Sequence, residues 1–180
     1  PGETRTRHVV DMIFGGCSPY TEVMQIRQVS EAFRFPFSSI SFTDADYPPE
    51  PCQSSPLTVQ LDICDQDVKK VLVDNGSSAD IIFRHTLDRM ILKEQGKVLP
   101  LEPGKGPLFG FGNQAVPIQG TIDLPTTFGS IPREVTALVR YNVVDVASPY
   151  NVIIGRPTLF FLGAIISTPH MKVKFPTAHG

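Results

Sequence analysis

The sequence predicts a mostly β domain with one or two short helices. Apolar and polar residues alternate over residues 57–63 with the two-residue period of a half-buried strand. The chain contains 17 prolines and 14 glycines, which suit short strands joined by turns better than long helices. The remaining apolar runs are short and are separated by Gly, Pro and Asp, as in a chain of small strands.

Each element follows from its own local signal. Residues 65–67 predict a turn between the strand at 57–63 and its hairpin partner at 68–73. Pro157 suits the first turn of a short helix over 157–162, which Gly163 ends. The other expected elements, in chain order, are a helical turn within 80–90, hairpin strands at 108–111 and 116–124 around Gly112-Asn113, strands at 135–146 and 151–154, and final strands at 164–167 and 171–175.

The first part of the chain reads differently from the rest. We expect residues 1–56 to be an N-terminal extension, with a helix at 21–34 and an extended proline-rich linker at 44–56. The domain is then expected at 57–177, followed by a tail at 178–180. Lys172 and Lys174 alternate with apolar neighbours, which predicts a strand with a solvated face.

Composition narrows the possible functions. The net charge of −2, from 16 basic and 18 acidic residues, gives no electrostatic reason to expect nucleic acid as a ligand. No apolar run has the length of a membrane span, and no signal peptide is visible, so we expect no membrane partner and a cytoplasmic location. The chain starts with Pro1, which indicates a piece of a longer protein or a processed product.

Cysteine and histidine usage predicts neither disulfides nor a metal site. Cys17, Cys52 and Cys64 cannot all pair, and none belongs to a Cys-x-x-Cys arrangement, so we expect reduced thiols. The four histidines are scattered without ligand spacing. We therefore expect no cofactor and no metal ion.

The most informative motif is an Asp-x-Gly triplet at the end of an apolar strand. Residues 71–73 lead into Asp74-Asn75-Gly76-Ser77, and a second apolar run follows at 81–83. A strand that delivers an aspartate to a tight loop is how aspartic proteases present a catalytic carboxylate. Taken alone, Asn-Gly between apolar runs favours a hairpin turn instead.

A second motif reverses that preference. About eighty residues downstream comes Tyr150-Asn151-Val152-Ile153-Ile154-Gly155-Arg156-Pro157, in which two apolar residues precede Gly-Arg. Together the two motifs make the chain resemble the retropepsin-like protease domain of an LTR retrotransposon Gag-Pol polyprotein, of the plant gypsy class. The resemblance covers about two thirds of the chain and includes its ending, residues 167–177.

The resemblance implies a fold and a role for each motif. The fold is a closed β-barrel or sandwich with a flap hairpin and one or two short helices. Asp74 is the catalytic acid, and Asn75, Gly76 and Ser77 complete the active-site loop. The flap over a bound peptide corresponds to Gly110, Phe111, Gly112 and Asn113. The residues that support the loop correspond to Asp80, Ile153, Ile154, Gly155 and Arg156, with Arg156 expected to pair with Asp80.

An aspartic protease needs two carboxylates that share one proton, because like charges about 3 Å apart cannot both ionise cheaply. Asp123 precedes Leu-Pro and Asp145 precedes Val-Ala, so neither starts a second Asp-x-Gly loop. The chain is therefore one half-site, and an active enzyme would be a homodimer with Asp74 supplied twice. Its substrate would be a polypeptide, the Gag-Pol polyprotein. Phe160 and Phe161 are expected to fill the core or the dimer interface.

Asn75 departs from the resemblance, because these proteases usually carry Thr or Ser there. That hydroxyl crosses the dimer axis, whereas Asn is larger and carries both a donor and an acceptor. Two alternatives to an active homodimer follow. One is a catalytically inactive retropepsin-fold dimerisation or binding module, and the other is a monomeric precursor that residues 1–56 restrain.

Overall fold

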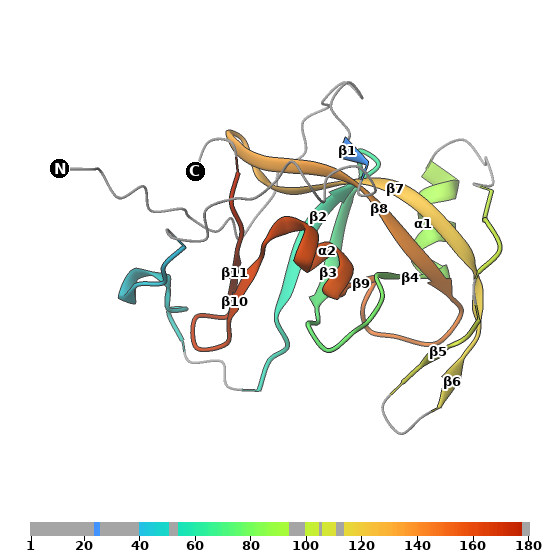
Figure 1. Ribbon diagram of the computed structural model, residues 1–180, viewed down its shortest axis with the longest axis horizontal. Helices are drawn as coiled ribbons and strands as arrows, with labels where there is room; N and C mark the ends of the chain where they lie inside the picture. Colours follow the sequence, from blue (N-terminus) through green and yellow to red (C-terminus); the bar gives the residue numbers. More distant parts are fainter. Residues whose placement is uncertain are drawn as a thin grey trace.

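The computed structural model describes residues 24–25, 40–50, 54–93, 100–104, 106–110 and 114–177 of the chain. These residues form mostly β structure with two α-helices (Figure 1). The strands are β1 (Met24–Gln25), β2 (Thr58–Ile63), β3 (Asp67–Val73), β4 (Ile81–Phe83), β5 (Leu108–Phe109), β6 (Ala115–Val116), β7 (Ile118–Ser130), β8 (Arg133–Val144), β9 (Val152–Ile154), β10 (Ile165–Ser167) and β11 (Lys172–Lys174). The helices are α1 (Arg84–Lys93), α2 (Arg156–Leu162) and a short 3₁₀ helix, Asp44–Asp46.

The main sheet closes on itself. Its strand order is β1-β8-β4-β9-β3-β2-β7, and β7 also pairs with β8. Strands β8, β4, β9, β3, β2 and β7 therefore form a closed six-stranded barrel, with β1 added beside β8. Two small antiparallel sheets, β5-β6 and β10-β11, complete the described structure. The predicted fold class, mostly β with a closed barrel and short helices, is confirmed.

The first hairpin shows why the local sequence predicts this architecture. β2 and β3 are antiparallel, and the main chains of Ile63 and Gln66 exchange hydrogen bonds of 2.9 and 3.1 Å. Cys64 and Asp65 between them have φ angles of 52° and 58°, the left-handed values of a two-residue type I′ turn. That turn matches the twist of the flanking strands, so the alternating pattern at 57–63 becomes a strand with one buried face.

The core fills the barrel and extends under both helices. Tyr141 is fully buried on β8, and its hydroxyl lies 3.0 Å from Thr126 Oγ1 on β7. Burial raises the pKa of this phenol, so it stays neutral and hydrogen-bonded. The other large side chains at the centre are aliphatic: Ile63, Val71, Ile82, Leu87, Val139, Val143, Val144, Val152 and Ile154.

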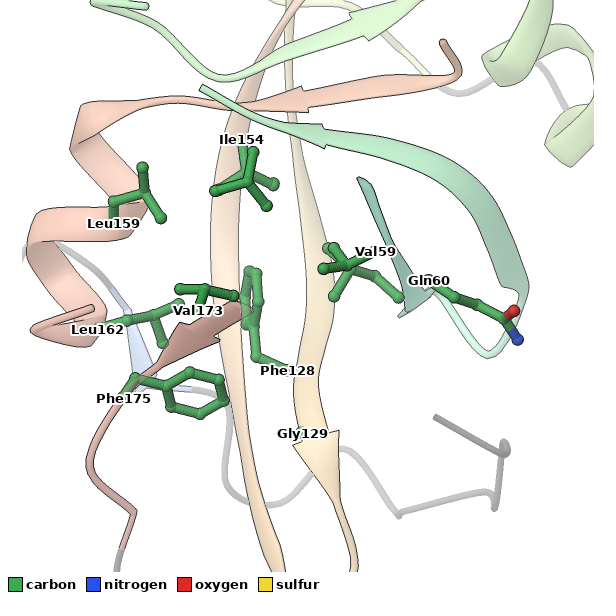
Figure 2. Close-up of a pocket in the computed structure, with 11 residues that line it drawn as sticks. Val59, Gln60, Phe128, Gly129, Ile154, Leu159, Leu162, Val173 and Phe175 are labelled. Atoms are coloured by element: carbon green, nitrogen blue, oxygen red, sulfur yellow. The ribbon is translucent and has the colours of Figure 1, made fainter. Parts of the chain in front are cut away.

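A small apolar cavity remains between the barrel, α2 and β11 (Figure 2). Its volume is about 30 Å³, which is too small for a substrate. Gln60 is the polar side chain at its border, and Figure 2 shows it pointing away from the other labelled side chains. The lining comprises Val59, Gln60, Leu61, Val73, Phe128, Gly129, Ile154, Leu159, Leu162, Val173 and Phe175. The cavity is therefore a packing defect of the core.

Two expectations for the first part of the chain are wrong where the structure describes it. Met24–Gln25 form a strand that pairs in parallel with β8 at Ala137 and Leu138, not part of a helix. Asp44–Asp46 form a 3₁₀ helix, not an extended linker, and Asp46 is buried. The rest of the helix expected at 21–34 lies outside the described residues.

Two expectations for the second half are also corrected. Lys174 does not face solvent: it is 1% exposed, because Asp46 and the carbonyl of Ser41 accept hydrogen bonds from its ammonium group. Of the two places expected for Phe160, the core is wrong, since the side chain is 89% exposed on α2, and the dimer interface stays a prediction. Its neighbour Phe161 is partly buried and does pack against the core.

Candidate active site

The loop that follows Asp74 is not a hairpin turn. β3 ends at Val73 and β4 begins at Ile81, but β9 lies between these two strands. β9 runs parallel to β3, with Leu72 opposite Ile153, and antiparallel to β4. The loop at 74–80 therefore crosses the end of β9. The hairpin alternative for Asn75-Gly76 is wrong because a distant strand separates the two apolar runs.

Backbone hydrogen bonds place Asp74 at the mouth of this loop. Its amide donates to the carbonyl of Ile154 at 2.9 Å, which extends the β3–β9 pairing by one residue. Its side chain is partly buried, and Oδ1 accepts a 2.8 Å hydrogen bond from the amide of Gly76. A Cβ on Gly76 would lie 3.0 Å from that oxygen, so glycine leaves room for the carboxylate to fold back onto the loop.

Gly155 is the point of closest contact between the two motifs. A Cβ at this position would clash with the carbonyl oxygen of Ala79 and lie 3.0 Å from that of Ser77. The amide of the next residue, Arg156, donates to the Ser77 carbonyl at 3.0 Å. Because the obstructing atoms are backbone, no side-chain rotation could make room. Only glycine lets the Asp74 loop and the start of α2 approach this closely.

Asp80 anchors the far end of the loop from inside the protein. It is 3% exposed, and its carboxylate accepts hydrogen bonds from the amide of Gly155 at 2.7 Å and from Thr158 Oγ1 at 2.9 Å. Burial raises the pKa of Asp80 to about 6, although these hydrogen bonds oppose the shift. The expected pairing of Arg156 with Asp80 is wrong, because neutral donors occupy both carboxylate oxygens.

Arg156 instead holds the tip of the loop. Its Nη1 donates to the carbonyls of Gly76 at 2.8 Å and of Asn75 at 3.3 Å. Carbonyl oxygens at a sharp turn lack strand partners, and a guanidinium has enough donors to satisfy both. Ser77 adds a bond within the loop, from its Oγ to the carbonyl of Ala79 at 2.7 Å. The loop is thus fixed from α2 while Asn75 and Gly76 stay exposed.

The hairpin expected to act as a flap is described only at its base. β5 and β6 are antiparallel, and the amide of Gly110 donates to the Gln114 carbonyl at 2.9 Å. Phe109, beside it, is 65% exposed. Figure 1 shows this hairpin projecting away from the body beyond the start of β7. Phe111, Gly112 and Asn113 lie outside the described residues.

Sequence reasoning missed two residues that support the site. Thr158 is fully buried and donates to Asp80, and Asn142 on β8 donates to the Asp80 carbonyl through its amide and its side chain. These contacts join residues 62 to 78 positions apart in the chain, so no local pattern indicates them. A polar residue one turn into a short apolar helix was the only available signal for Thr158.

The described ranges contain neither a metal-binding cluster nor a membrane-spanning helix. No group of three or more His, Cys, Asp or Glu side chains there is arranged to hold a metal ion. No helix in the same ranges has the length and apolar character needed to cross a membrane.

Comparison with known proteins gives structural neighbours only. No family model matches the chain, and no curated protein matches it. The retroviral protease-like domain of Ddi1 from Leishmania major is similar in structure, with a TM-score of 0.44 and 23% identity over 68% of this chain and 95% of that one. A retropepsin-like aspartic protease from Rickettsia conorii has a TM-score of 0.43 and 15% identity over 65% of this chain and 78% of that one.

Proposed function

We propose that the protein is an aspartic endopeptidase that works as a homodimer and processes a retrotransposon Gag-Pol polyprotein. One observation carries the proposal: Asp74 lies in a loop that Gly155 and Arg156 bracket from β9 and α2, with its carboxylate at the open side. The two sequence motifs, about eighty residues apart, thus meet at the loop that carries Asp74.

The chemistry needs a second copy of the chain. Asp74 is the only aspartate here that begins an Asp-x-Gly triplet. Two such carboxylates at a two-fold axis share one proton. The ionised carboxylate takes a proton from a bound water, which attacks the peptide carbonyl, while the protonated one donates to the carbonyl oxygen. No covalent intermediate forms, and the two Asp74 side chains exchange roles as the amine leaves.

The contacts of Asp80, Gly155 and Arg156 that hold the Asp74 loop support this mechanism. Catalysis by paired carboxylates depends on their separation, and small displacements at a reacting centre cost large factors in rate. The Asp74 loop is fixed by backbone hydrogen bonds, by the buried Asp80 carboxylate and by the Arg156 guanidinium at its tip. The exposed hairpin at Phe109 and Gly110 is suited to cover an extended peptide above it.

The test is cleavage of a denatured protein substrate between about pH 4 and 7, the range suggested by shared-proton dyads. We expect the wild-type chain to cut the substrate and Asp74→Ala to abolish cutting. The matched control is Asp88→Ala, which removes an aspartate at a half-buried ion pair with Arg84 on α1. Retained cleavage in Asp74→Ala, or none in a folded wild-type dimer, would refute the proposal.

The second candidate is an inactive retropepsin-fold dimerisation or binding module, and Asn75 favours it. Asn75 is exposed at the tip of the loop, where a partner copy's loop would meet it. Its larger side chain would then separate the two Asp74 carboxylates. If this is the cause of inactivity, Asn75→Thr creates cleavage in an otherwise silent chain, whereas an inactive Asn75→Thr dimer removes that explanation.

A further inference from the structure

We propose that residues 41–47 are a clasp of the folded domain, which fixes the β10–β11 hairpin and, through α2, the position of the Asp74 loop. The part of the proposal that concerns catalysis rests on the proposed function, and the part that concerns the clasp does not. The unit that carries the site would then begin near residue 40 and not at residue 57.

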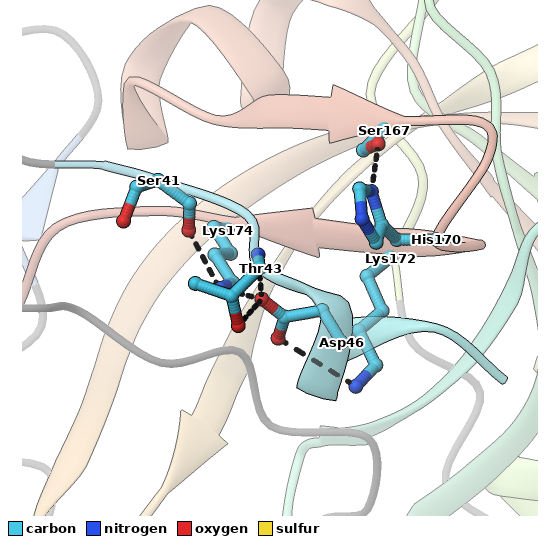
Figure 3. Close-up of polar contacts among 7 residues, drawn as sticks. All are labelled: Ser41, Thr43, Asp46, Ser167, His170, Lys172 and Lys174. Atoms are coloured by element: carbon cyan, nitrogen blue, oxygen red, sulfur yellow. Dashed lines mark hydrogen bonds and ion pairs between the residues drawn. The ribbon is translucent and has the colours of Figure 1, made fainter.

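The clasp is locked by a buried ion pair (Figure 3). Lys174 Nζ lies 2.8 Å from Asp46 Oδ2 and 2.7 Å from the carbonyl of Ser41, and it sits 4.7 Å from the centre of the Phe42 ring. Lys172 approaches the other carboxylate oxygen of Asp46, at 3.8 Å. An ammonium this deeply buried needs its partners, because removing one of them leaves an uncompensated charge.

Hydrogen bonds within the clasp segment itself hold the shape that this contact needs. The amide of Thr43 donates to Asp46 Oδ2 at 2.8 Å, and the amide of Asp46 donates to the Thr43 carbonyl at 2.9 Å. The second bond closes the 3₁₀ turn, and the first, the carboxylate half of a capping box, holds Asp46 Oδ2 where Lys174 reaches it. The lysine and the surrounding hydrogen bonds lower the pKa of Asp46 to about 2.

Aromatic contacts extend the clasp to the turn between β10 and β11. The His170 ring stacks on Phe42 with 5.1 Å between centroids and lies 4.2 Å from the Tyr47 ring. On its other side, Nδ1 of His170 lies 2.6 Å from Ser167 Oγ, as Figure 3 shows. Strand β11 and the turn are thereby tied directly to residues 42–47, and β10 is tied to them through His170 and its pairing with β11.

A short path leads from the hairpin to the site. β10 begins three residues after α2 ends, and Gly163 between them has a left-handed φ of 59°. The amide of Ala164 donates back to the Leu159 carbonyl at 2.9 Å, so the hairpin and the helix share one fixed junction. At the other end of the same helix, Arg156 holds the carbonyls of Asn75 and Gly76. A loose hairpin would therefore loosen the base on which the loop rests.

The test compares Asp46→Asn with Asp44→Asn in the full chain. Both remove one carboxylate from the same 3₁₀ helix, but Asp44 is exposed whereas Asp46 is the partner of Lys174. Hydrogen exchange of the amides at 41–47 should become at least about tenfold faster in Asp46→Asn and change less than about twofold in Asp44→Asn. Exchange at 74–79 should rise in the same variant. Equal exchange at 41–47 in the two variants overturns the clasp.

Two further variants, Lys174→Met and the double variant, distinguish loss of the Lys174–Asp46 ion pair from general misfolding. Lys174→Met should loosen residues 41–47 as much as Asp46→Asn does, and the double variant should add nothing further, because both remove one interaction. Effects that add fully would show that the two side chains act separately and would overturn the lock. Faster exchange at 41–47 with unchanged exchange at 74–79 would overturn the link to the catalytic loop.

Cleavage supplies the last readout. In an active chain, Asp46→Asn should lower kcat more than it changes KM, whereas Asp44→Asn should match wild type. Equal kcat in the two variants would overturn the link to catalysis. If wild type itself cuts nothing, the proposed function fails, while the exchange measurements still decide the clasp.

Discussion

Asp80 shows how a single buried residue can make stability depend on pH. The donors described around its carboxylate are uncharged, namely Gly155 N and the hydroxyl and amide of Thr158, so desolvation dominates and raises the pKa of Asp80 from 3.8 to about 6. Asp46 behaves in the opposite way, since Lys174 lowers its pKa to about 2. Two aspartates of one domain therefore respond to acid in different pH windows.

The Asp80 shift leads to a prediction for pH between about 4 and 7. There the folded chain holds a proton that the unfolded chain has lost, so this contribution to stability is full below the unfolded pKa of 3.8 and is lost as pH rises through about 6. The loss should amount to on the order of 3 kcal/mol. Asp80→Asn removes the titration but keeps an acceptor for Gly155. The free energy of unfolding, measured with denaturant at several pH values in this range, should fall less steeply with rising pH in the variant than in wild type. An identical pH dependence in the two proteins would contradict the prediction.

Gly155 gives a second prediction at the residue scale. Gly155→Ala places a methyl group against the Ala79 carbonyl, so the free energy of unfolding should fall by more than about 2 kcal/mol. The control is Gly110→Ala, whose Cβ would meet only the Gln114 carbonyl at 3.8 Å, an ordinary contact. Its expected cost is below about 1 kcal/mol. Equal costs in chemical unfolding would mean that the backbone at Ala79 can move aside.

Helix α2 is the element that connects the core to the site. Pro157 near its start and left-handed Gly163 at its end set its length, as the sequence predicts. One face contributes Leu159 and Leu162 to the core, while Arg156 holds the Asp74 loop. Phe160 points to solvent and adds nothing to this packing. The helix can therefore position the loop because one of its faces is fixed by burial.

Two substitutions at neighbouring positions of α2 test whether its buried face, and not its exposed face, contributes to stability. Leu159→Ala should cost about 2–4 kcal/mol of stability, because it removes a buried side chain beside the existing cavity. Phe160→Ala should change stability by less than about 0.5 kcal/mol, since that ring is already exposed. Both values come from denaturant unfolding. A large cost for Phe160→Ala at low protein concentration would show that the ring is buried in solution.

For the whole molecule, barrel closure and the single Asp-x-Gly loop have different consequences. Closure through β7 and β8 leaves the domain structurally complete as one chain. The proposed chemistry, however, requires a second Asp74 that the same chain lacks. Folding and activity should therefore separate when the protein is diluted.

This separation gives a prediction about concentration. Cleavage per chain should fall on dilution, because each active site would need two chains, whereas the circular dichroism of the barrel should stay constant. Activity and sedimentation, measured over the same dilution series, provide the check. Specific activity that does not change while the chain becomes monomeric would exclude a site shared between copies.

The sequence by itself determined the local features of this protein. The β2–β3 hairpin and the limits of α2 follow from patterns within about a dozen residues, where turn chemistry and strand alternation act, whereas the Asp74 loop was indicated only together with the motif about eighty residues downstream. The prediction that Lys174 faces solvent was wrong because it also rested on a local pattern, the alternation of Lys172 and Lys174 with apolar residues. Alternation shows that two faces differ, but it does not show what covers the polar one.

Only the tertiary structure decided which distant segments meet. β9 enters between β3 and β4, Asp80 binds Gly155 and Thr158, and Lys174 pairs with Asp46 across 128 positions of sequence. Each contact depends on closing a long loop, and many other polar partners would fit the same local pattern. The burial that makes these contacts strong exists only after the barrel has closed, because a buried charge or hydrogen bond gains its value from the exclusion of water.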